Sequence, residues 1–242
     1  MRIVEPSVEL LAYTQLPPNG CCHFSMGEEE PCAYKQVPED PCSEMTRVVE
    51  RCGRVSWKSE DKIAKGSADG FMTRVVNIRK DESIAEHASI TLLFTTDRYV
   101  THQLVRHRIA AYTQESTHYI NYGKEKFGNE IAVCRPMGIA EGSADFNVWY
   151  DAMLRSEEAY KTLLTAGVKH YHARYALPSC LKTEIAVTFN LRMWRHVLTL
   201  RCSPNNTPEI VHVMKLALKI VSELCPPMFE DLAKQYLAEG SK

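Results

Sequence analysis

The stretch ASITLLFTTDRYVTHQLVRHR, residues 88–108, decides how this chain folds. Its first eight residues alternate, so that the even-numbered positions carry Ala, Ile, Leu and Phe while the odd-numbered ones are mostly polar. An apolar period of two, rich in β-branched and aromatic residues, predicts a β-strand over residues 88–95. Residues 95–97 then offer helix N-caps, and the spacing becomes helical over residues 98–107. The stretch therefore predicts a strand, a polar turn and a helix.

The helix is expected to end in the cationic sequence Arg106-His107-Arg108, which is followed after seven residues by Ser116. An arginine presents a planar fork of donors that binds phosphate in a bidentate manner and keeps its charge. A single arginine in a last helical turn would only complement the helix dipole. Two arginines around a histidine, at the point where a helix ends and a polar loop with Ser116 is expected to begin, favour a site for an anionic ligand.

A second segment of the same kind lies downstream. Residues 183–189 alternate and predict a strand that ends at Asn190. A helix of about ten residues is expected next, closed by Arg201, with a break over residues 202–206. One stripe of this helix carries residues spaced by four: Arg192, His196 and Leu200. The two segments share no alignable repeat, so the pattern does not indicate a duplication.

Together these residues resemble the flavin-dependent thymidylate synthases, whose signature is Arg-His-Arg, seven residues and then Ser. Further matches occur in the family's order and at compatible spacing: Glu86-His87-Ala88-Ser89, Gln103, Ala173-Arg174-Tyr175-Ala176-Leu177-Pro178, and Asn190-Leu191-Arg192 through His196 to Leu200-Arg201. The resemblance covers roughly residues 8–16 and 43–236.

The resemblance implies the reductive methylation of dUMP to dTMP. Methylenetetrahydrofolate would supply the carbon, FAD would carry the reducing equivalents, and NADPH would reduce the flavin. Because the cofactor does the difficult chemistry, the protein is expected to bind, orient and polarise, with no covalent protein nucleophile. The family also implies a homotetramer with sites completed across subunits.

The resemblance also assigns roles to individual residues, and it implies no metal ligand. Catalytic roles fall on Arg201, which would polarise the uracil ring, and on Ser116 as a hydroxyl or backbone donor. The positions that resemble flavin-binding residues are His87, Ser89, Arg106, His107, Arg108, Asn190, Arg192 and His196. Those that resemble dUMP-binding residues are Gln103, Arg106, Gln114, Glu115, Ser116, His118, Arg174 and Arg201, with Arg174 on the phosphate.

Three residues depart from the family pattern: Ala111 stands where Ser is frequent, Thr113 where Asn is frequent, and His118 where Arg is common. An imidazole carries charge only below its pKa, ordinarily about 6.5. The hypothesis follows that nucleotide affinity weakens between about pH 6 and 8 more than a permanent arginine would allow.

Length and composition suit one well-buried domain over residues 1–242. The chain has 242 residues, of which 45% are hydrophobic and 24% charged. The predicted fold is α+β, with a central, mainly antiparallel sheet wrapped by helices; the sheet sense comes from the resemblance. A net charge of −1 disfavours a nucleic-acid partner. No stretch has membrane-spanning length and the N-terminus has no signal-peptide core, so a cytoplasmic protein is expected.

Nine cysteines occur, and residues 17–42 are rich in Cys and Pro. The odd number disfavours a disulfide framework, and without a Cys-x-x-Cys pair free thiols are favoured over a zinc site. The segment 17–42 is expected to be an irregular insertion, because proline and glycine punctuate it.

Two other functions stay open. One is a thymidylate synthase with a cysteine nucleophile, for which Pro178-Ser179-Cys180 offers a faint match without the following histidine. The other is a non-catalytic homologue that binds flavin or nucleotide, which only the departures at Ala111 and His118 support.

Overall fold

The computed structural model describes residues 1–16 and 42–238, so the predicted insertion lies outside the described residues except for Cys42. The strands are β1 (Arg2–Ile3), β2 (Ser7–Tyr13), β3 (Ser89–Asp97), β4 (Ala111–Gln114), β5 (Ala132–Val133) and β6 (Lys182–Asn190). The helices are α1 (Glu44–Val55), α2 (Ser67–Met72), α3 (Arg98–Leu104), α4 (Ala144–Thr165), α5 (His170–Ala173), α6 (Leu191–Arg201), α7 (Pro208–Leu224) and α8 (Pro226–Tyr236).

Short segments of 3₁₀ or π helix connect some of these elements. They are η2 (Glu60–Lys62), η3 (Thr73–Ile78), η4 (Glu82–His87), η5 (Glu125–Phe127) and η6 (Arg174–Ala176). The segment η4 ends one residue before β3 and carries His87, the first residue of the predicted flavin site.

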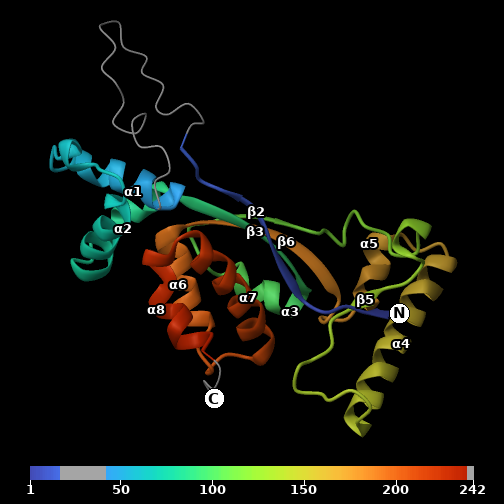
Figure 1. Cartoon of the computed structure of the whole chain (residues 1–242). Coiled ribbons are helices and arrows are strands. Elements are labelled where there is room, and N and C mark those ends of the chain that lie inside the picture. The colour runs from blue at the N-terminus through green and yellow to red at the C-terminus, as the bar shows by residue number, and fades with distance from the viewer. Residues whose placement is uncertain (17–41, 239–242) are drawn as a thin grey trace, which may run out of the picture. The chain divides into compact units, whose positions relative to one another are not determined.

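The main sheet is four-stranded and antiparallel, in the order β2-β3-β6-β4. Of its strands, β2, β3 and β6 are labelled in Figure 1. A second, small sheet pairs β1 with β5 in parallel. The alternation predicted for both strands is confirmed: Ile90, Leu92 and Phe94 of β3 are fully buried, as are Ile185 and Val187 of β6. The prediction of an α+β fold with a mainly antiparallel sheet is confirmed.

The chain divides into two compact units. Unit 1 comprises Met1–Glu9, Leu93–Val187 and Pro204–Val213, and unit 2 comprises Leu10–Leu92, Thr188–Ser203 and Met214–Lys242. Strand β3 begins in unit 2 and ends in unit 1, and strand β6 begins in unit 1 and ends in unit 2. One domain over the whole chain stays a prediction.

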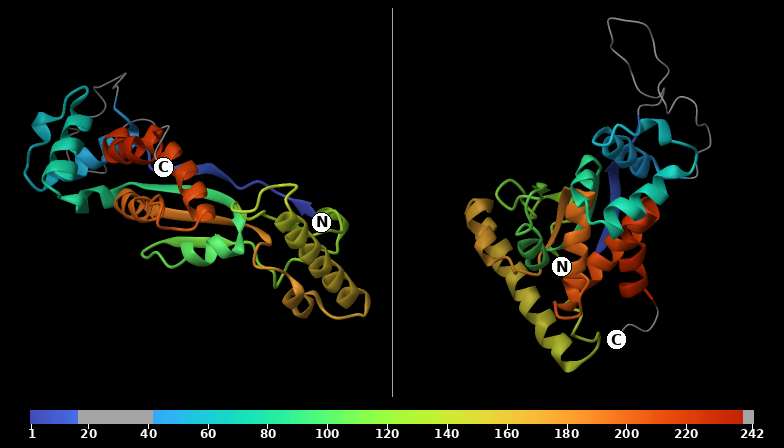
Figure 2. Two further views of the ribbon diagram at one scale, coloured as in Figure 1. Left: turned by 90° about the horizontal axis from the view of Figure 1, so that it is seen from below. Right: turned by 90° about the vertical axis from the view of Figure 1, so that its left-hand side faces the viewer.

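Unit 2 is organised around helix α6. The indole Nε1 of Trp194 donates to the carbonyl of Ile90 in β3 at 3.0 Å, and its ring meets Phe189 edge-on at 4.8 Å. Arg195 of α6 binds Asp231 of α8 through two hydrogen bonds, the longer one 2.8 Å. The helices α1 and α2 of this unit lie side by side, as both views in Figure 2 show. Burial of Trp194 therefore fixes α6 against β3.

Unit 1 has a separate core beneath helix α4. It is formed by Tyr122, Ile131, Val133, Tyr160, Ala173 and Leu181. The short helix α5 packs beside α4 in both views of Figure 2. Only Glu157 and Tyr160 of α4 are buried. Glu157 forms an ion pair with the N-terminal ammonium of Met1, with 3.0 Å between its Oε2 and the nitrogen. Helix α4 thus covers this core with Tyr160 and binds the N-terminus through Glu157.

Two expectations around the cationic motif need correction. The predicted helix over residues 98–107 ends at Leu104, because the one hydroxyl hydrogen of Tyr112 is shared between the carbonyls of Leu104 and His107, at 2.9 and 2.8 Å, and this stabilises a turn there. The polar run after Arg108 was expected to be a loop, but its middle forms β4 at the edge of the main sheet. The motif therefore occupies a turn between helix and strand. No helix within residues 1–16 and 42–238 is long and apolar enough to cross a membrane.

Candidate functional site

Unit 2 joins two sequence segments that lie a hundred residues apart. The N–H of Leu191, which begins α6, donates to the carbonyl of Ala88 at 2.9 Å. Strands β3 and β6, which lead from and to these residues, are joined by a hydrogen bond of 2.8 Å between the hydroxyls of Thr91 and Thr188. The start of β3 and the start of α6 thus meet, as their neighbouring positions in Figure 1 indicate. This brings together four predicted flavin-binding residues: His87, Ser89, Asn190 and Arg192.

Arg192 is held by two carboxylates of the segment η4. Its Nη1 lies 2.6 Å from Glu86 Oε1, and its Nε lies 3.5 Å from Glu82 Oε2. The hydrogen bond to Glu86 raises the pKa of Arg192 above its usual value. The side chain is still half exposed, and a guanidinium has donors beyond those that two such contacts use. Arg192 is therefore oriented from one side and accessible from the other.

Asn190 explains why α6 begins where it does. Its extended backbone and its Oδ1, which accepts from the N–H of Met193 at 2.8 Å, form an N-cap. Ser89 is anchored through its backbone N–H, which donates to Thr14 Oγ1 at 2.9 Å. His196 follows Arg192 by one turn on the exposed side, and the half-buried Arg201 is the last residue of α6. These residues also belong to unit 2.

Unit 1 holds the cationic motif and the polar run. Gln103 lies in the last turn of α3, whereas the turn that follows carries His107 half-buried and both arginines exposed. Arg106 bends back so that its Nε donates to the carbonyl of His102 at 3.2 Å. The two arginines of the motif thus present their charge to the surface of unit 1.

Gln114 and Ser116 serve local structure in this state. The Nε2 of Gln114 donates to Thr101 Oγ1 at 2.9 Å and to Thr183 Oγ1 at 3.3 Å. Ser116 Oγ accepts the N–H of His118 at 3.2 Å, which turns the chain back on itself. The His118 ring is exposed and stacks on Tyr171, with ring centres 5.4 Å apart. The segment after β4 is thereby shaped into a tight polar turn.

Glu115, between Gln114 and Ser116, has every polar group engaged. Its N–H donates to the carbonyl of Glu184 at 2.8 Å, and its carbonyl accepts from Arg98 Nη1 at 3.3 Å. Its carboxylate accepts from Tyr122 Oη at 2.7 Å and from Lys182 Nζ at 3.3 Å. Only 13% of the side chain is exposed. The carboxylate therefore points into unit 1.

A cavity of about 540 Å³ opens beside the polar turn of residues 116–118. Arg174, the predicted phosphate ligand, lines it together with residues that the sequence did not single out: Arg98, His102, Thr117, Tyr175 and Ser179. Arg98 and His102 are one helical turn apart on α3, so both face the same side of that helix. Two guanidiniums, an imidazole and three hydroxyls can bind a phosphate monoester.

The predicted residues thus fall into two sets, one in each unit. Unit 1 contains Gln103, Arg106, His107, Arg108, Gln114, Glu115, Ser116, His118 and Arg174; unit 2 contains His87, Ser89, Asn190, Arg192, His196 and Arg201. The cavity residues that sequence reasoning missed lie on α3, next to Ser116, and at or just after η6. Their signal was weak: Arg98 and His102 share the helical face that points away from the apolar one.

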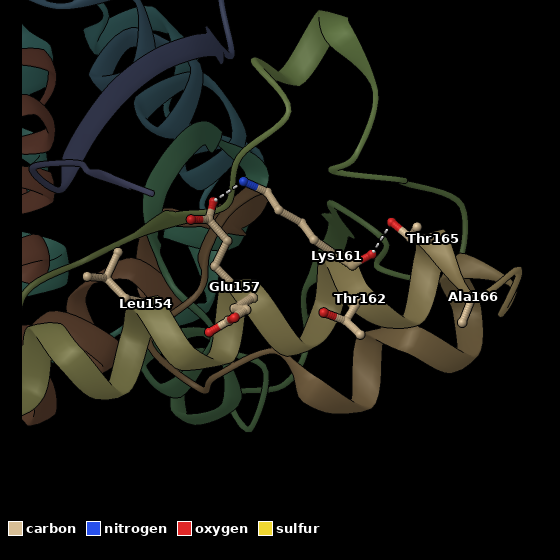
Figure 3. A pocket seen from close by; sticks show the side chains of 7 residues that line it. Leu154, Glu157, Lys161, Thr162, Thr165 and Ala166 are labelled. Atoms are coloured by element: carbon tan, nitrogen blue, oxygen red, sulfur yellow. Dashed lines mark hydrogen bonds and ion pairs between the residues drawn. The ribbon is translucent and has the colours of Figure 1, made fainter.

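A further depression of about 550 Å³ follows the outer face of α4 (Figure 3). Its polar groups bind one another: Lys161 Nζ lies 3.3 Å from Glu157 Oε1, and Thr165 Oγ1 donates to the Lys161 carbonyl at 3.0 Å. None of the predicted site residues lines it. The described ranges contain no group of three His, Cys, Asp or Glu side chains placed to hold a metal ion.

Known proteins are similar to this chain both in sequence and in fold. A family profile described as thymidylate synthase complementing protein matches residues 40–227. A flavin-dependent thymidylate synthase of Geobacter sulfurreducens is 31% identical over 172 residues, 71% of this chain and 72% of that protein. One of Pyrococcus furiosus is 34% identical over 173 residues, 71% of this chain and 68% of that protein.

A solved structure, a UMP/dUMP methylase of Streptomyces cacaoi bound with 5-Br dUMP, has the same fold with a TM-score of 0.70. It covers 96% of this chain and 97% of its own, at 21% sequence identity. The profile match spans most of the chain, and the relatives named above cover two thirds or more of it. The chain belongs to the family of the flavin-dependent thymidylate synthases.

Proposed function

We propose that this protein catalyses the reductive methylation of dUMP to dTMP, with methylenetetrahydrofolate as carbon donor, FAD as redox cofactor and NADPH as reductant. The observation that carries the proposal is the hydrogen bond between Leu191 N–H and the Ala88 carbonyl. It unites the two segments that resemble the family's flavin site, although they are remote in sequence. The names of the relatives and of the solved structure support the substrate and the flavin.

The donor set at the start of α6 fits a flavin dinucleotide. Arg192 offers an oriented and accessible cation, His87 and His196 are exposed, and Asn190 carries an amide at the helix start. A dinucleotide has phosphates for the cation and heteroaromatic edges for the amide and imidazole groups. When bound, FAD would supply the hydride chemistry that the side chains lack. Together with Ser89 and the Arg106-His107-Arg108 motif, these residues would hold it.

The cavity of unit 1 fits the nucleotide. Arg174, which lines the cavity, would bind the phosphate. Ser116 and His118 would lie at the turn beside it, and Gln103 and Gln114 would lie around the base. Arg201 would polarise the uracil, since a cation near the ring stabilises negative charge that develops on it. Because the sets lie in separate units, we propose that a homotetramer completes each site with groups from more than one subunit.

No cysteine is assigned to attack the pyrimidine. The thiol of Cys180 donates to the Met153 sulfur at 3.2 Å, and burial raises its pKa to about 11. A nucleophilic thiol needs a lowered pKa and an accessible, electropositive setting. The geometry of Cys180 thus supports a mechanism without a covalent protein nucleophile.

The experiment is an absorption spectrum of the purified protein followed by a turnover assay. Bands of oxidised flavin that shift when dUMP is added, and formation of dTMP from dUMP with methylenetetrahydrofolate and NADPH, are the expected results. A flavin-free protein that gains no flavin on incubation with FAD contradicts the proposal. A flavin spectrum that responds to dUMP without any dTMP formation identifies a binding homologue instead.

A further inference from the structure

Glu115 directly precedes Ser116, and its environment differs from that of a ligand-binding carboxylate. Both of its carboxylate oxygens face protein donors, Tyr122 Oη at 2.7 Å and Lys182 Nζ at 3.3 Å. A carboxylate that is 13% exposed and fully engaged has little left to offer a nucleotide. Its carboxylate contacts Lys182 of β6 and Tyr122, which follows the turn at Ser116.

The two donors are themselves fixed. Lys182, the first residue of β6, also binds Glu184 Oε1 at 2.5 Å, and only 20% of its side chain is exposed. Tyr122 packs in the unit 1 core, with its ring 6.2 Å from that of Tyr160. Because both donors belong to rigid parts of unit 1, the carboxylate between them is immobilised.

The backbone of Glu115 is held as well, through Glu184 and Arg98. Both the backbone and the side chain of Glu115 are therefore fixed directly before Ser116. Groups that bind a ligand act most strongly when their geometry is set before the ligand arrives.

We infer that Lys182 and Tyr122 are positioning residues for nucleotide binding, which act by clamping Glu115 and so fixing the turn that carries Ser116 and His118. This inference rests on the proposed function, because it takes that turn as part of the dUMP site. It adds two residues that touch no substrate and assigns Glu115 a structural link to the site through its carboxylate.

The test uses the variants Lys182→Met and Tyr122→Phe, with dUMP affinity measured by isothermal titration calorimetry on the FAD-loaded protein. Each variant is expected to weaken dUMP binding about tenfold, the loss of one hydrogen bond to a charged group. Since the reacting groups are untouched, KM for dUMP should rise while kcat at saturation stays within about twofold. Lys182→Arg keeps a cation at the same place and should restore most of the affinity.

Lys161→Met is the matched control, because it removes another lysine–glutamate pair of 3.3 Å in unit 1, on α4. It should leave dUMP affinity unchanged. Unchanged or tighter dUMP binding in both Lys182→Met and Tyr122→Phe overturns the inference, as does a lower melting temperature with normal affinity of the folded fraction. If the unaltered protein itself binds no dUMP, the proposed function fails and the inference falls with it.

Discussion

Cys180 lies next to the cavity residues, yet its chemistry is that of a packing residue. Burial raises the pKa of its thiol to about 11, so thiolate is scarce at neutral pH. We predict that Cys180→Ala keeps at least about half of the wild-type kcat, with a loss of stability of about 1 kcal/mol from the vacated volume. Steady-state turnover and urea unfolding measure both. A fall of about a thousandfold in kcat would restore the cysteine-nucleophile alternative.

His118 departs from the family pattern described in the sequence analysis, in which arginine is common at this position. Its ring stacks on Tyr171 and meets Tyr119 edge-on at 4.8 Å, so it is placed beside the turn that begins at Ser116. A guanidinium always carries charge and presents a planar fork of donors to a phosphate, whereas an imidazole does not. We predict that dUMP binds about tenfold more tightly to His118→Arg than to the natural chain, the gain of one hydrogen bond to a charged group.

Isothermal titration of both proteins with dUMP measures this difference. Equal affinity of the natural chain and of His118→Arg would show that residue 118 does not lie beside the phosphate.

At the scale of elements, periodicity predicted the two strand–helix segments well. The buried positions of β3 and β6 alternate as the sequence does, and Asn190 ends β6 and caps α6 at the predicted residue. Such local signals depend only on neighbours in the chain. The early end of α3 depends instead on the Tyr112 hydroxyl, which no periodicity reveals.

In the candidate site, too, features that depend on local sequence could be predicted, whereas features that depend on tertiary contacts could not. The cationic motif and the Asn190–Arg201 helix could be found from residue types and spacing together with the family resemblance. The clamp on Glu115 could not, because Lys182 is 67 positions away and reaches it only through pairing of β4 with β6. Arg98 and His102 were equally hidden, since an exposed cation at a helix start has many ordinary explanations.

The cap of α3 allows a test of how a buried carboxylate is tolerated. Asp97 Oδ1 accepts from the N–H of Val100 at 2.7 Å, and burial, aided by Glu209, raises the pKa of Asp97 above its usual value despite this hydrogen bond. The folded state therefore binds the proton more tightly than the unfolded state. Stability linked to Asp97 is fully present below the unfolded pKa, about 3.9, and declines as pH rises through the folded value.

We predict that Asp97→Asn, which can still cap the helix, gains stability relative to the natural chain as pH rises through that window. Asp97→Ala removes the cap and should cost about 1 kcal/mol at neutral pH. Urea unfolding at pH 4 and pH 7 measures both variants. An Asn variant that loses stability relative to the natural chain between these pH values would show that the carboxylate charge is favoured in the fold.

At the scale of the whole molecule, chain order and unit membership do not coincide. The predicted residues alternate along the sequence: His87 and Ser89 in unit 2, residues 103–118 and Arg174 in unit 1, and residues 190–201 in unit 2 again. The strands β3 and β6 carry the chain from one unit to the other within a single element. The proposed flavin-binding and dUMP-binding residues therefore both fall in two units, and these can be combined within one chain or between chains.

Subunit complementation distinguishes these two arrangements. We predict that Arg174→Ala, altered in unit 1, and Arg192→Ala, altered in unit 2, are each inactive alone but recover activity when they are co-expressed. If a site takes unit 1 from one subunit and unit 2 from another, random mixing leaves about one quarter of the sites with both units intact. Turnover per bound flavin in the mixed oligomers, purified through two different tags, measures this fraction.

Separately purified variants that are mixed without subunit exchange serve as the control and should stay inactive. If each site were built within one chain, every chain in the mixture would carry one defective unit, and no activity could return. Activity near one quarter therefore requires that the two guanidiniums which serve one site come from different subunits. Activity at the background of the single variants would instead place Arg174 and Arg192 of the same chain at one site, and the oligomer would then be dispensable for assembling it.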